Sequence, residues 1–264
     1  MRKGIPYQMA APHLCDKPVR TNGEQHCHKK LKTLTLGLVA AFNIMACAQI
    51  TNDKPAMLRP TQATWDAYAP VEDEPTLPRV LLIGDSISEG YTVPVRNLLK
   101  GKANVHRIPE NAGPTTNGLV ALGKWLKAGK WEVIHFNWGL HDLKIMKDDT
   151  RQVSPTAYEA NLRSLVNQLQ QTGAKLIWAT TTPVPTTDAK LTVKRRAADV
   201  PIYNSIAKSI MEENHVAIDD LYGLALPQLS EIQLPANVHF TTAGYLVLGK
   251  RVAACIESAL PKKS

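Results

Sequence analysis

Apolar and polar positions over residues 79–260 follow two alternating patterns. Short apolar runs typical of buried strands alternate with stretches in which apolar residues recur every three or four positions. The strand-like runs are 79–84, 103–108, 131–139, 174–182 and 215–220. The helix-like stretches are 93–101, 117–129, 155–173, 201–214 and 242–260. Five strands alternating with helices predict an α/β fold with a parallel sheet covered by helices on both faces.

The segment before this pattern has a different composition. Polar residues separate its prolines, which are Pro55, Pro60, Pro70, Pro75 and Pro78. Such a composition favours an extended arm or linker. We therefore predict three parts: an N-terminal extension with a leader over 1–48, an arm over 49–78 and a folded domain over 79–264.

The residues that follow Lys29 have the pattern of a secretory signal. A basic cluster precedes an apolar run from Leu34 to Ala46, and small residues then flank Cys47. The run has about 13 residues, fewer than the roughly 20 that a membrane-spanning helix needs, so we expect no stable membrane insertion. Cleavage after Ala48 would export the protein to the periplasm or the medium. A lipoprotein anchored through Cys47 is the alternative.

Composition and charge exclude several classes of protein. Of the 264 residues, 44% are hydrophobic and 20% are charged, which is typical of a globular protein. The net charge is +8, but residues 1–48 hold seven of the 31 basic and two of the 23 acidic residues, which leaves 24 against 21 in the rest. We therefore expect no nucleic-acid partner. Beyond the leader, the sequence has no HExxH, CxxC pair or acidic ligand cluster, so we expect no metal and no cofactor.

Residues able to do chemistry follow directly after several predicted strands. In an open parallel sheet the ligand crevice lies beyond the carboxyl ends of the strands, so these loops are where a site is expected. The segments are GDSIS at 84–88, NAGPTT at 111–116, NWGLHD at 137–142 and, before the last helix, VHFT at 238–241.

Together these segments resemble the SGNH hydrolases, also called the GDSL family of esterases and lipases, over essentially all of residues 79–260. GDSI at 84–87 matches the nucleophile block of the family, and Gly113 matches the block with a backbone oxyanion donor. GLHD at 139–142 matches the block usually written GxND, and VHFT matches the histidine block. The resemblance implies a three-layer α/β/α sandwich, flavodoxin-like, with a five-stranded parallel sheet, and ester hydrolysis through an acyl-enzyme.

Physical chemistry supports the catalytic roles that the resemblance implies. A serine between a buried strand and a helix start holds its oxygen at the positive end of the helix dipole. Its hydroxyl needs a neighbouring base, and an imidazole can accept that proton and return it to the leaving group. We predict Ser86 as nucleophile and His239 as base. The oxyanion donors are expected to be the N–H groups of Ser86 and Gly113 and a side chain at position 141.

Position 141 departs from the family pattern. Most relatives have Asn there, whereas this sequence has His141. A neutral imidazole donates one N–H, so the oxyanion role survives if the tautomer is right. The alternatives are a structural histidine bonded to a backbone carbonyl, and the amide of Asn137 facing the site in its place.

The sequence departs from the family pattern a second time at the residue that orients His239. The family places an acidic residue three positions before the histidine, and that position is Ala236 in this sequence. Either a Ser-His dyad operates with His239 held by a carbonyl or by Asn237, or a carboxylate reaches the ring from elsewhere. The candidate carboxylates are Glu231, Asp219 and Asp220. Without a replacement, loss of the acid costs about 10⁴ in turnover, which leaves open a degenerate scaffold without activity.

Three further residues are candidates for contact with substrate. Asp85 and Asp142 adjoin the motif residues, where they can also brace the loops as hydrogen-bond acceptors. The indole of Trp138 could stack on a sugar ring or pack in the core. Basic residues on the connection after the fourth strand, among them Arg195, either steer an anionic substrate or form a solvated surface.

The sequence thus predicts an exported serine esterase that acts on small acyl groups, with O-acetyl groups on carbohydrate as the expected substrate. The small-acyl preference rests on the scarcity of Phe, of which the chain has three, and on the lack of an extended apolar lid segment. The alternatives are a lysophospholipase or thioesterase of the same fold and a glycan-binding protein without activity. The expected partner is a small-molecule or glycan ester; the sequence does not predict an oligomeric state.

Overall fold

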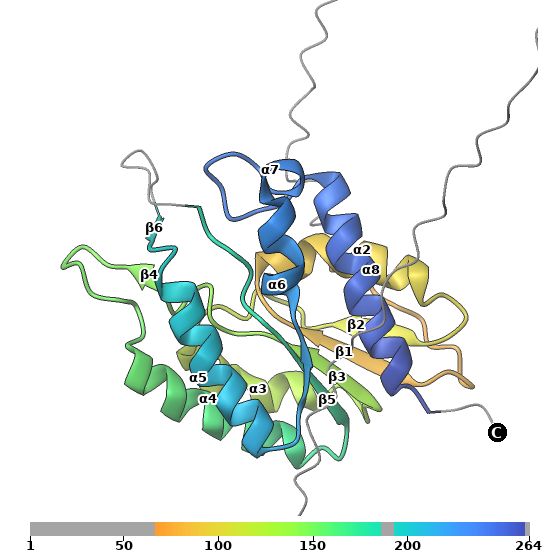
Figure 1. Cartoon of the computed structure of the whole chain (residues 1–264). Helices are drawn as coiled ribbons and strands as arrows, with labels where there is room; N and C mark the ends of the chain where they lie inside the picture. The colour runs from red at the N-terminus through yellow and green to blue at the C-terminus, as the bar shows by residue number, and fades with distance from the viewer. Residues whose placement is uncertain (1–66, 186–192, 262–264) are drawn as a thin grey trace, which may run out of the picture. The chain divides into compact units, whose positions relative to one another are not determined.

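A computed structural model of the chain describes residues 67–185 and 193–261 (Figure 1). All of these residues belong to one compact unit. The predicted leader over 1–48 and the first part of the arm lie outside them.

A parallel five-stranded sheet forms the centre of the domain. Its strands are β1 (Arg79–Ile83), β2 (Asn104–Arg107), β3 (Val133–Phe136), β5 (Lys175–Ala179) and β7 (Ala217–Asp219). They lie in the order β2-β1-β3-β5-β7, so the chain reverses its direction of winding next to β1. In flavodoxin-like sheets that reversal is where the ligand crevice opens. The sequence pattern predicted each of these strands, and the α/β fold is confirmed.

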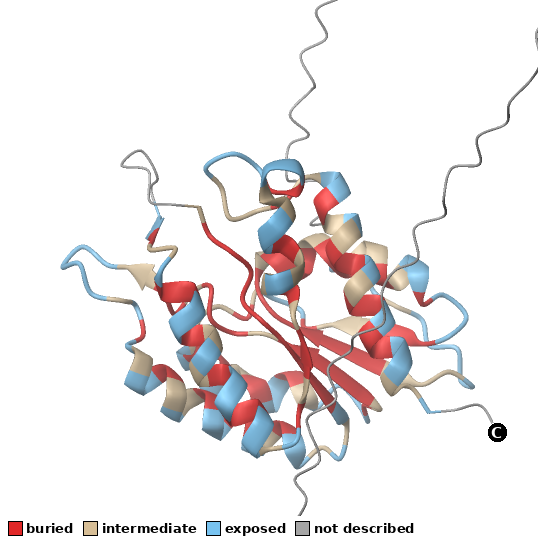
Figure 2. Ribbon diagram, viewed as in Figure 1, coloured by how far each residue is buried: buried red, intermediate tan, exposed pale blue. Residues whose placement is uncertain are grey.

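Helices cover both faces of the sheet, as predicted. Helices α2 (Ser86–Leu98) and α8 (Thr242–Ala259) pack together on one face, and the other face carries α3 (Thr115–Leu126), α4 (Pro155–Gln170) and α5 (Asp199–Glu213) (Figure 1). Figure 2 shows the buried residues concentrated along the strands and the inward sides of the helices. Because both faces of the sheet are covered, the central strands are mostly apolar, and β3 is buried along its whole length, its His135 included.

Helix α2 begins seven residues before the predicted stretch 93–101. Asp85 caps it by accepting the Ile87 N–H at 2.9 Å, which makes Ser86 the first helical residue. The helix contains Gly90 and Pro94, two residues with low helix propensity that obscured its start in the sequence. Packing against α8 explains why the helix forms nevertheless: a β-carbon added at Gly249 of α8 would lie 2.6 Å from that of Pro94.

Four short elements beyond the predicted pattern border the site. Strands β4 (Lys144–Ile145) and β6 (Lys194–Arg195) pair antiparallel outside the main sheet. Helices α6 (Leu221–Ala225) and α7 (Leu229–Ile232), joined by the 3₁₀ turn Leu226–Gln228, lead toward the histidine loop. Elements of two to five residues are too short to show a hydrophobic period, so the sequence did not predict them.

The described end of the arm, residues 67–78, lies along the outer strand β2. Asp73 binds Arg79 Nε at 2.8 Å and His106 Nε2 at 2.6 Å. The Asn104 side chain donates to the carbonyl oxygens of Glu74 and Leu77 at 3.0 and 3.1 Å. These contacts cover the exposed edge of the sheet, where an unpaired strand would otherwise invite pairing with another chain.

No helix in the described part of the chain is long and apolar enough to cross a membrane.

Candidate active site

Two segments far apart in the sequence meet beyond the carboxyl ends of the strands. Ser86 follows β1 as the first residue of α2, and His239 lies in the loop between α7 and α8. The Ser86 Oγ atom lies 2.9 Å from Nε2 of His239, across a sequence separation of 153 residues. Both residues are half-buried. The structure therefore brings the predicted nucleophile and the predicted base into hydrogen-bond contact.

Asn237 determines which ring nitrogen of His239 carries the proton. Its Oδ1 atom lies 3.0 Å from the backbone nitrogen of His239, and a backbone N–H can only donate, so the atom that faces it is the amide oxygen. The same Oδ1 lies 2.8 Å from Nδ1, which must therefore carry a hydrogen. In the neutral ring Nε2 then has none and can accept the hydroxyl proton of Ser86. The loop thus holds the tautomer that a general base needs.

The three candidate carboxylates have other positions. Asp219 is fully buried and binds His135 at 3.1 Å and Arg251 at 2.9 Å. Asp220 caps α6 by accepting the Gly223 N–H at 2.9 Å, and Glu231 is exposed on α7. Of the alternatives that the sequence left open, the structure shows the amide of Asn237 beside the ring.

The loop that carries Asn237 is a tight turn. The Leu234 N–H donates to the carbonyl oxygen of His239 at 2.9 Å, and the Asn237 N–H donates to that of Leu234 at 3.2 Å. Ala236, at the position of the acidic residue in the family, has a φ of 50°, a left-handed conformation that costs an L-residue about 1–2 kcal/mol. The turn therefore holds Asn237 under the ring at the expense of backbone strain.

Burial and nearby charge keep His239 neutral. Burial lowers the pKa of His239 below its ordinary value, Arg195 contributes in the same direction, and Asp85 and Glu89 oppose the shift. The lowered pKa means that the imidazole stays unprotonated to lower pH than a free histidine.

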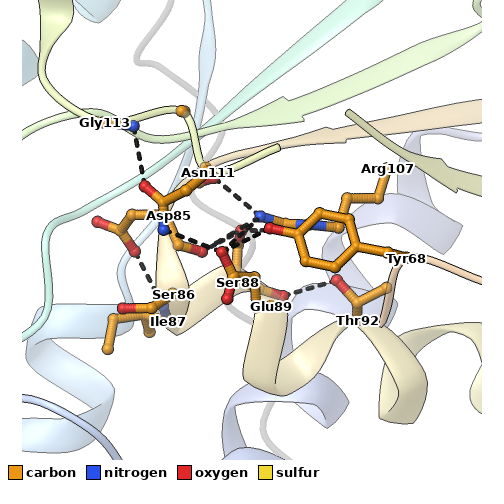
Figure 3. A network of polar contacts seen from close by, with 12 residues as sticks. Tyr68, Asp85, Ser86, Ile87, Ser88, Glu89, Thr92, Arg107, Asn111 and Gly113 are labelled. Atoms are coloured by element: carbon orange, nitrogen blue, oxygen red, sulfur yellow. Dashed lines mark hydrogen bonds and ion pairs between the residues drawn. The ribbon is translucent and has the colours of Figure 1, made fainter. Parts of the chain in front are cut away.

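The loop with Gly113 is tied to α2 through side chains. Gly113 has a φ of 63°, and its N–H donates to Oδ1 of Asn111 at 3.0 Å. Asn111 Nδ2 donates to Glu89 Oε1 at 2.9 Å, and the same oxygen accepts the Tyr68 hydroxyl at 2.7 Å (Figure 3). The predicted backbone oxyanion donor is therefore part of a network that runs from the arm through a buried carboxylate to the site.

Arg107 places a positive charge beneath the nucleophile loop. Its side chain, 1% exposed, lies 3.5 Å from Glu89 Oε1. It donates to Oγ of Ser88 at 2.5 Å and to the carbonyl oxygen of Gly84 at 3.0 Å (Figure 3). These bonds hold the backbone just before Ser86 and the side chain of Ser88 just after it. The sequence did not predict a role for Arg107 or Glu89, and it placed Asn111 in a candidate loop without assigning it a role.

Asn137 and His141, the alternative side-chain donors, have different surroundings. Asn137 Nδ2 donates to the Ala179 carbonyl oxygen at 2.7 Å and to Thr181 Oγ1 at 3.2 Å, which directs its amide hydrogens to β5 and the loop after it. His141 is half-buried and its Nδ1 lies 3.0 Å from Nζ of Lys144. The amide hydrogens of Asn137 are thus used in structural hydrogen bonds. In His141 the contact with Lys144 uses Nδ1, and Nε2 lies on the other side of the ring.

The three residues expected to contact substrate are instead buried. Asp85, Trp138 and Asp142 have exposed fractions of 4%, 1% and 0%. Asp85 caps α2, and Asp142 Oδ1 accepts the Thr115 N–H at 2.9 Å and the Thr115 hydroxyl at 2.5 Å. Trp138 packs on Gly118 of α3, where a β-carbon would lie 2.9 Å from the ring. Their burial supports the alternative in which they brace the loops and the core.

Two hollows in the described part of the chain differ in size and position. The cavity beside α2, lined in part by Ile87, Tyr91 and Leu140, has a volume of about 10 Å³. A hollow of about 380 Å³ opens at the amino ends of β5 and β7, near Lys175 and Ala217, which is the opposite end of the sheet from Ser86. Within residues 67–185 and 193–261, no group of three or more His, Cys, Asp or Glu could hold a metal ion.

The comparisons with known proteins agree with this geometry. A family model of GDSL-like lipases and acylhydrolases matches residues 82–247, more than half of the chain. The chain belongs to this GDSL-like family. As a GDSL-type protein it is a hydrolase of ester bonds, as its motifs predicted. No match was found among curated protein sequences.

Solved structures of esterases share the fold of this GDSL-type chain. The acetyl xylan esterase AlAXEase aligns with a TM-score of 0.58 at 16% identity, over 67% of this chain and 99% of its own. A lipase/acylhydrolase from Enterococcus faecalis aligns with a TM-score of 0.59 at 20% identity, over 71% and 99%. An acetylxylan esterase from Geobacillus stearothermophilus aligns with a TM-score of 0.56 at 19% identity, over 70% of this chain and 97% of its own. The likeness confirms the predicted SGNH hydrolase fold.

Proposed function

We propose that this GDSL-type hydrolase removes small acyl groups, chiefly O-acetyl groups on carbohydrate, through an acyl-enzyme on Ser86. The contact of 2.9 Å between Ser86 Oγ and His239 Nε2 is the observation that carries the proposal. A serine hydroxyl is a weak nucleophile unless a base takes its proton as it attacks, and this contact supplies that base.

The reaction follows from the tautomer of His239. Ser86 Oγ attacks the ester carbonyl carbon while its proton passes to Nε2, and the Nδ1 hydrogen remains bonded to Asn237 Oδ1. As the tetrahedral intermediate collapses, Nε2 returns the proton to the departing alcohol and leaves the acyl group on Ser86. Water then gives its proton to Nε2 and attacks the acyl-enzyme, which releases the acid and restores the serine.

The oxyanion of the intermediate is stabilised by donors from three loops. Ser86 lies in the first turn of α2, where backbone N–H groups lack intrahelical partners and the helix dipole favours negative charge. The Gly113 N–H, which donates to Asn111 Oδ1, contributes when the oxyanion forms. It then either leaves Asn111 Oδ1 for the oxyanion or donates to both oxygens. The His141 ring contributes the third donor. Removing one such donor typically costs about 3–4 kcal/mol of transition-state stabilisation.

The sequence supports a short acyl group. The chain has only three Phe, and its sequence has no extended apolar lid segment. A long acyl chain needs a large apolar pocket. The acetyl xylan esterases among the similar structures are consistent with an O-acetylated carbohydrate as substrate.

The acyl preference is tested by measuring hydrolysis of p-nitrophenyl esters from acetyl to octanoyl, together with acetate release from acetylated xylooligosaccharides. We expect kcat/KM to fall with chain length and acetate to be released from the oligosaccharide. A rise of kcat/KM with chain length would instead support the alternative of a lysophospholipase or thioesterase. Ser86→Ala, which removes the nucleophile without enlarging the side chain, is the matched control and should retain less than roughly 10⁻³ of the activity.

Export is part of the proposal and rests on the sequence of residues 29–48. Expression of the full chain in a bacterial host, followed by intact-mass measurement of the periplasmic and membrane fractions, tests it. A soluble product that begins at Gln49 would support simple cleavage. A membrane-associated product that begins at a lipid-modified Cys47 would support the lipoprotein alternative, and an uncleaved cytosolic chain would contradict export.

A further inference from the structure

His141 and Lys144 form a hydrogen-bonded pair next to the Ser86–His239 pair. The Nζ atom of Lys144 lies 3.0 Å from Nδ1 of His141. An ammonium group has three hydrogens and no acceptor, so Nδ1 must accept and carries no hydrogen. The neutral His141 ring then has its single hydrogen on Nε2, at the side of the ring away from Lys144.

The backbone around Lys144 is held from several directions. The Lys144 N–H donates to the carbonyl oxygen of His141 at 3.2 Å, which folds the lysine back over the histidine, and its own carbonyl accepts the Gln152 N–H at 2.7 Å. Lys144 also pairs with Arg195 across the β4–β6 ladder. Arg195 Nε donates to the Leu140 carbonyl oxygen at 2.7 Å, which joins the ladder to the loop of His141. The contact between the two side chains is therefore built into the fold.

The surroundings keep the His141 ring neutral. Burial, together with the nearby Lys144, Arg195 and His239 and against an opposing effect of Glu89, lowers the pKa of His141 to about 4. His141 lies in the loop after β3 and Ser86 follows β1, and these neighbouring parallel strands end in register at Ile83 and Phe136, so both residues lie at the same edge of the sheet. At neutral pH the ring therefore has one hydrogen to donate, and the position of that hydrogen decides whether it can serve the oxyanion.

We propose that Lys144 is a positioning residue: it holds His141 in the Nε2–H tautomer and orients this hydrogen toward the oxyanion that forms at Ser86. The inference rests on the proposed esterase function. The two histidines are then held in opposite tautomers: Asn237 keeps the hydrogen of His239 on Nδ1, and Lys144 keeps that of His141 on Nε2. One ring can accept a proton and the other can donate a hydrogen bond.

The proposed role involves no proton transfer. Lys144 keeps its three hydrogens and His141 keeps its one throughout the reaction. The ammonium withdraws electron density from the ring through Nδ1, which makes the Nε2 hydrogen a stronger donor. Charge-assisted hydrogen bonds are roughly twice as strong as neutral ones. The His141–Lys144 pair thereby takes the place of the asparagine that most relatives have at this position. An asparagine amide presents a donor without the help of a second residue.

The tautomer is tested directly by ¹⁵N NMR of the histidine rings in the full chain, because protonated and unprotonated ring nitrogens have well-separated chemical shifts. We expect a protonated Nε2 for His141 and a protonated Nδ1 for His239 near neutral pH. Assignment uses His141→Asn and His239→Ala. A His141 ring that carries its hydrogen on Nδ1 would overturn the proposal.

The catalytic consequence is tested with a double-mutant cycle. Lys144→Met should lower kcat for p-nitrophenyl acetate roughly tenfold with little change in KM, and Lys144→Arg, which keeps a cationic donor, should restore most of that loss. In the His141→Asn background, Lys144→Met should change kcat by no more than about twofold. Equal losses in both backgrounds would show that Lys144 does not act through His141 and would overturn the proposal.

Lys147→Met is the matched control, because Lys147 is an exposed lysine three positions farther along the chain. It should leave kcat unchanged. Absence of Ser86-dependent hydrolysis in the unmodified protein would overturn the esterase function and with it the oxyanion role of His141. The ring spectrum would still report whether Lys144 determines the tautomer, so the two failures are distinguishable.

Discussion

The imidazole of His239 is held by the neutral side chain of Asn237, where a Ser-His-Asp system has a carboxylate. An amide oxygen orients the ring and selects its tautomer as a carboxylate does. It adds less stabilisation to the imidazolium that forms when Ser86 attacks, because a neutral acceptor binds a charged donor less strongly than an anionic one does. The site thus has the geometry of a triad with reduced electrostatic support.

A carboxylate at position 237 should strengthen the base. In Asn237→Asp we expect the pKa of His239 to rise by about one unit. The acid limb of the kcat/KM profile should then move to higher pH by the same amount. On the plateau above it, kcat should increase, because the imidazolium is better stabilised. A pH series of p-nitrophenyl acetate hydrolysis measures both effects.

Asn237→Ala is the companion variant. It removes the acceptor and should lower kcat roughly tenfold, about the value of one neutral hydrogen bond. An unchanged rate in Asn237→Ala would show that the amide does not orient the base.

The buried carboxyl group of Asp142 leads to a second prediction. Its Oδ2 atom is buried without a hydrogen-bond partner in the described part of the chain, and burial raises its pKa from 3.8 to about 6. The folded state therefore holds the proton more tightly than the unfolded chain does. The resulting stability is fully present below about pH 4 and is lost as pH rises through about 6.

Relative to Asp142→Asn, the free energy of unfolding of the unmodified protein should therefore fall by about 3 kcal/mol between about pH 4 and about pH 7. Urea unfolding of both proteins at a series of pH values measures the difference. Parallel pH dependences would contradict the raised pKa.

The catalytic residues could be predicted from the sequence to the extent that they follow strands. Ser86 and His239 were identified because GDSI at 84–87 and VHFT at 238–241 resemble motif blocks of the family, and because these segments follow a predicted strand or precede a predicted helix. Asn237 remained one of several alternatives, because the turn at Ala236 that carries it has no signal in the hydrophobic pattern. The buried pair Glu89 and Arg107 was missed. The hydrophobic pattern gives no sign of it, because Glu89 is two positions from both Ile87 and Tyr91 and therefore lies on a different side of α2.

At the scale of elements, the packing of α2 on α8 positions the nucleophile. A β-carbon at Gly90 would overlap the ring of Tyr245 on α8, so the two helices can approach this closely only with glycine there. Gly90 lies one turn after Ser86, and a displacement of α2 would move the nucleophile relative to His239.

Gly90→Ala should destabilise the protein by about 1–3 kcal/mol, the typical cost of an overpacked contact. Gly123→Ala is the matched control: Gly123 is an exposed glycine within α3, and a β-carbon there would meet no atom within 4 Å. It should stabilise the protein by about 0.5–1 kcal/mol, the helix-propensity difference. Urea unfolding measures both effects, and equal effects of the two substitutions would contradict the close packing.

The main elements could be predicted because each has enough residues to show its period. All five strands of the sheet and the helices that cover it were predicted. The predicted start of α2 was seven residues too late, because Gly90 and Pro94 interrupt its pattern. The β4–β6 ladder was not predicted, since it joins Lys144 to Arg195 through two-residue strands. It nevertheless provides the lysine that binds His141.

For the molecule as a whole, the arm is coupled to the site. Tyr68 reaches Glu89, Glu89 accepts from Asn111, and Asn111 accepts the Gly113 N–H, so hydrogen bonds connect the described end of the arm with the oxyanion loop (Figure 3). The proline content of residues 49–78 predicted an extended segment but not its contacts. Single long-range contacts between polar residues leave no periodic trace in a sequence.

The most direct test of the central claim is covalent labelling with a fluorophosphonate, which reacts with a serine oxygen as a neighbouring base removes its proton and fluoride departs. The measurement is the rate of adduct formation, with the labelled peptide identified by mass spectrometry. We predict a stable adduct on Ser86, none at that position in Ser86→Ala, and much slower labelling in His239→Ala. Failure to label Ser86, or equal labelling rates in the unmodified protein and His239→Ala, would contradict the assignment of a serine nucleophile activated by His239.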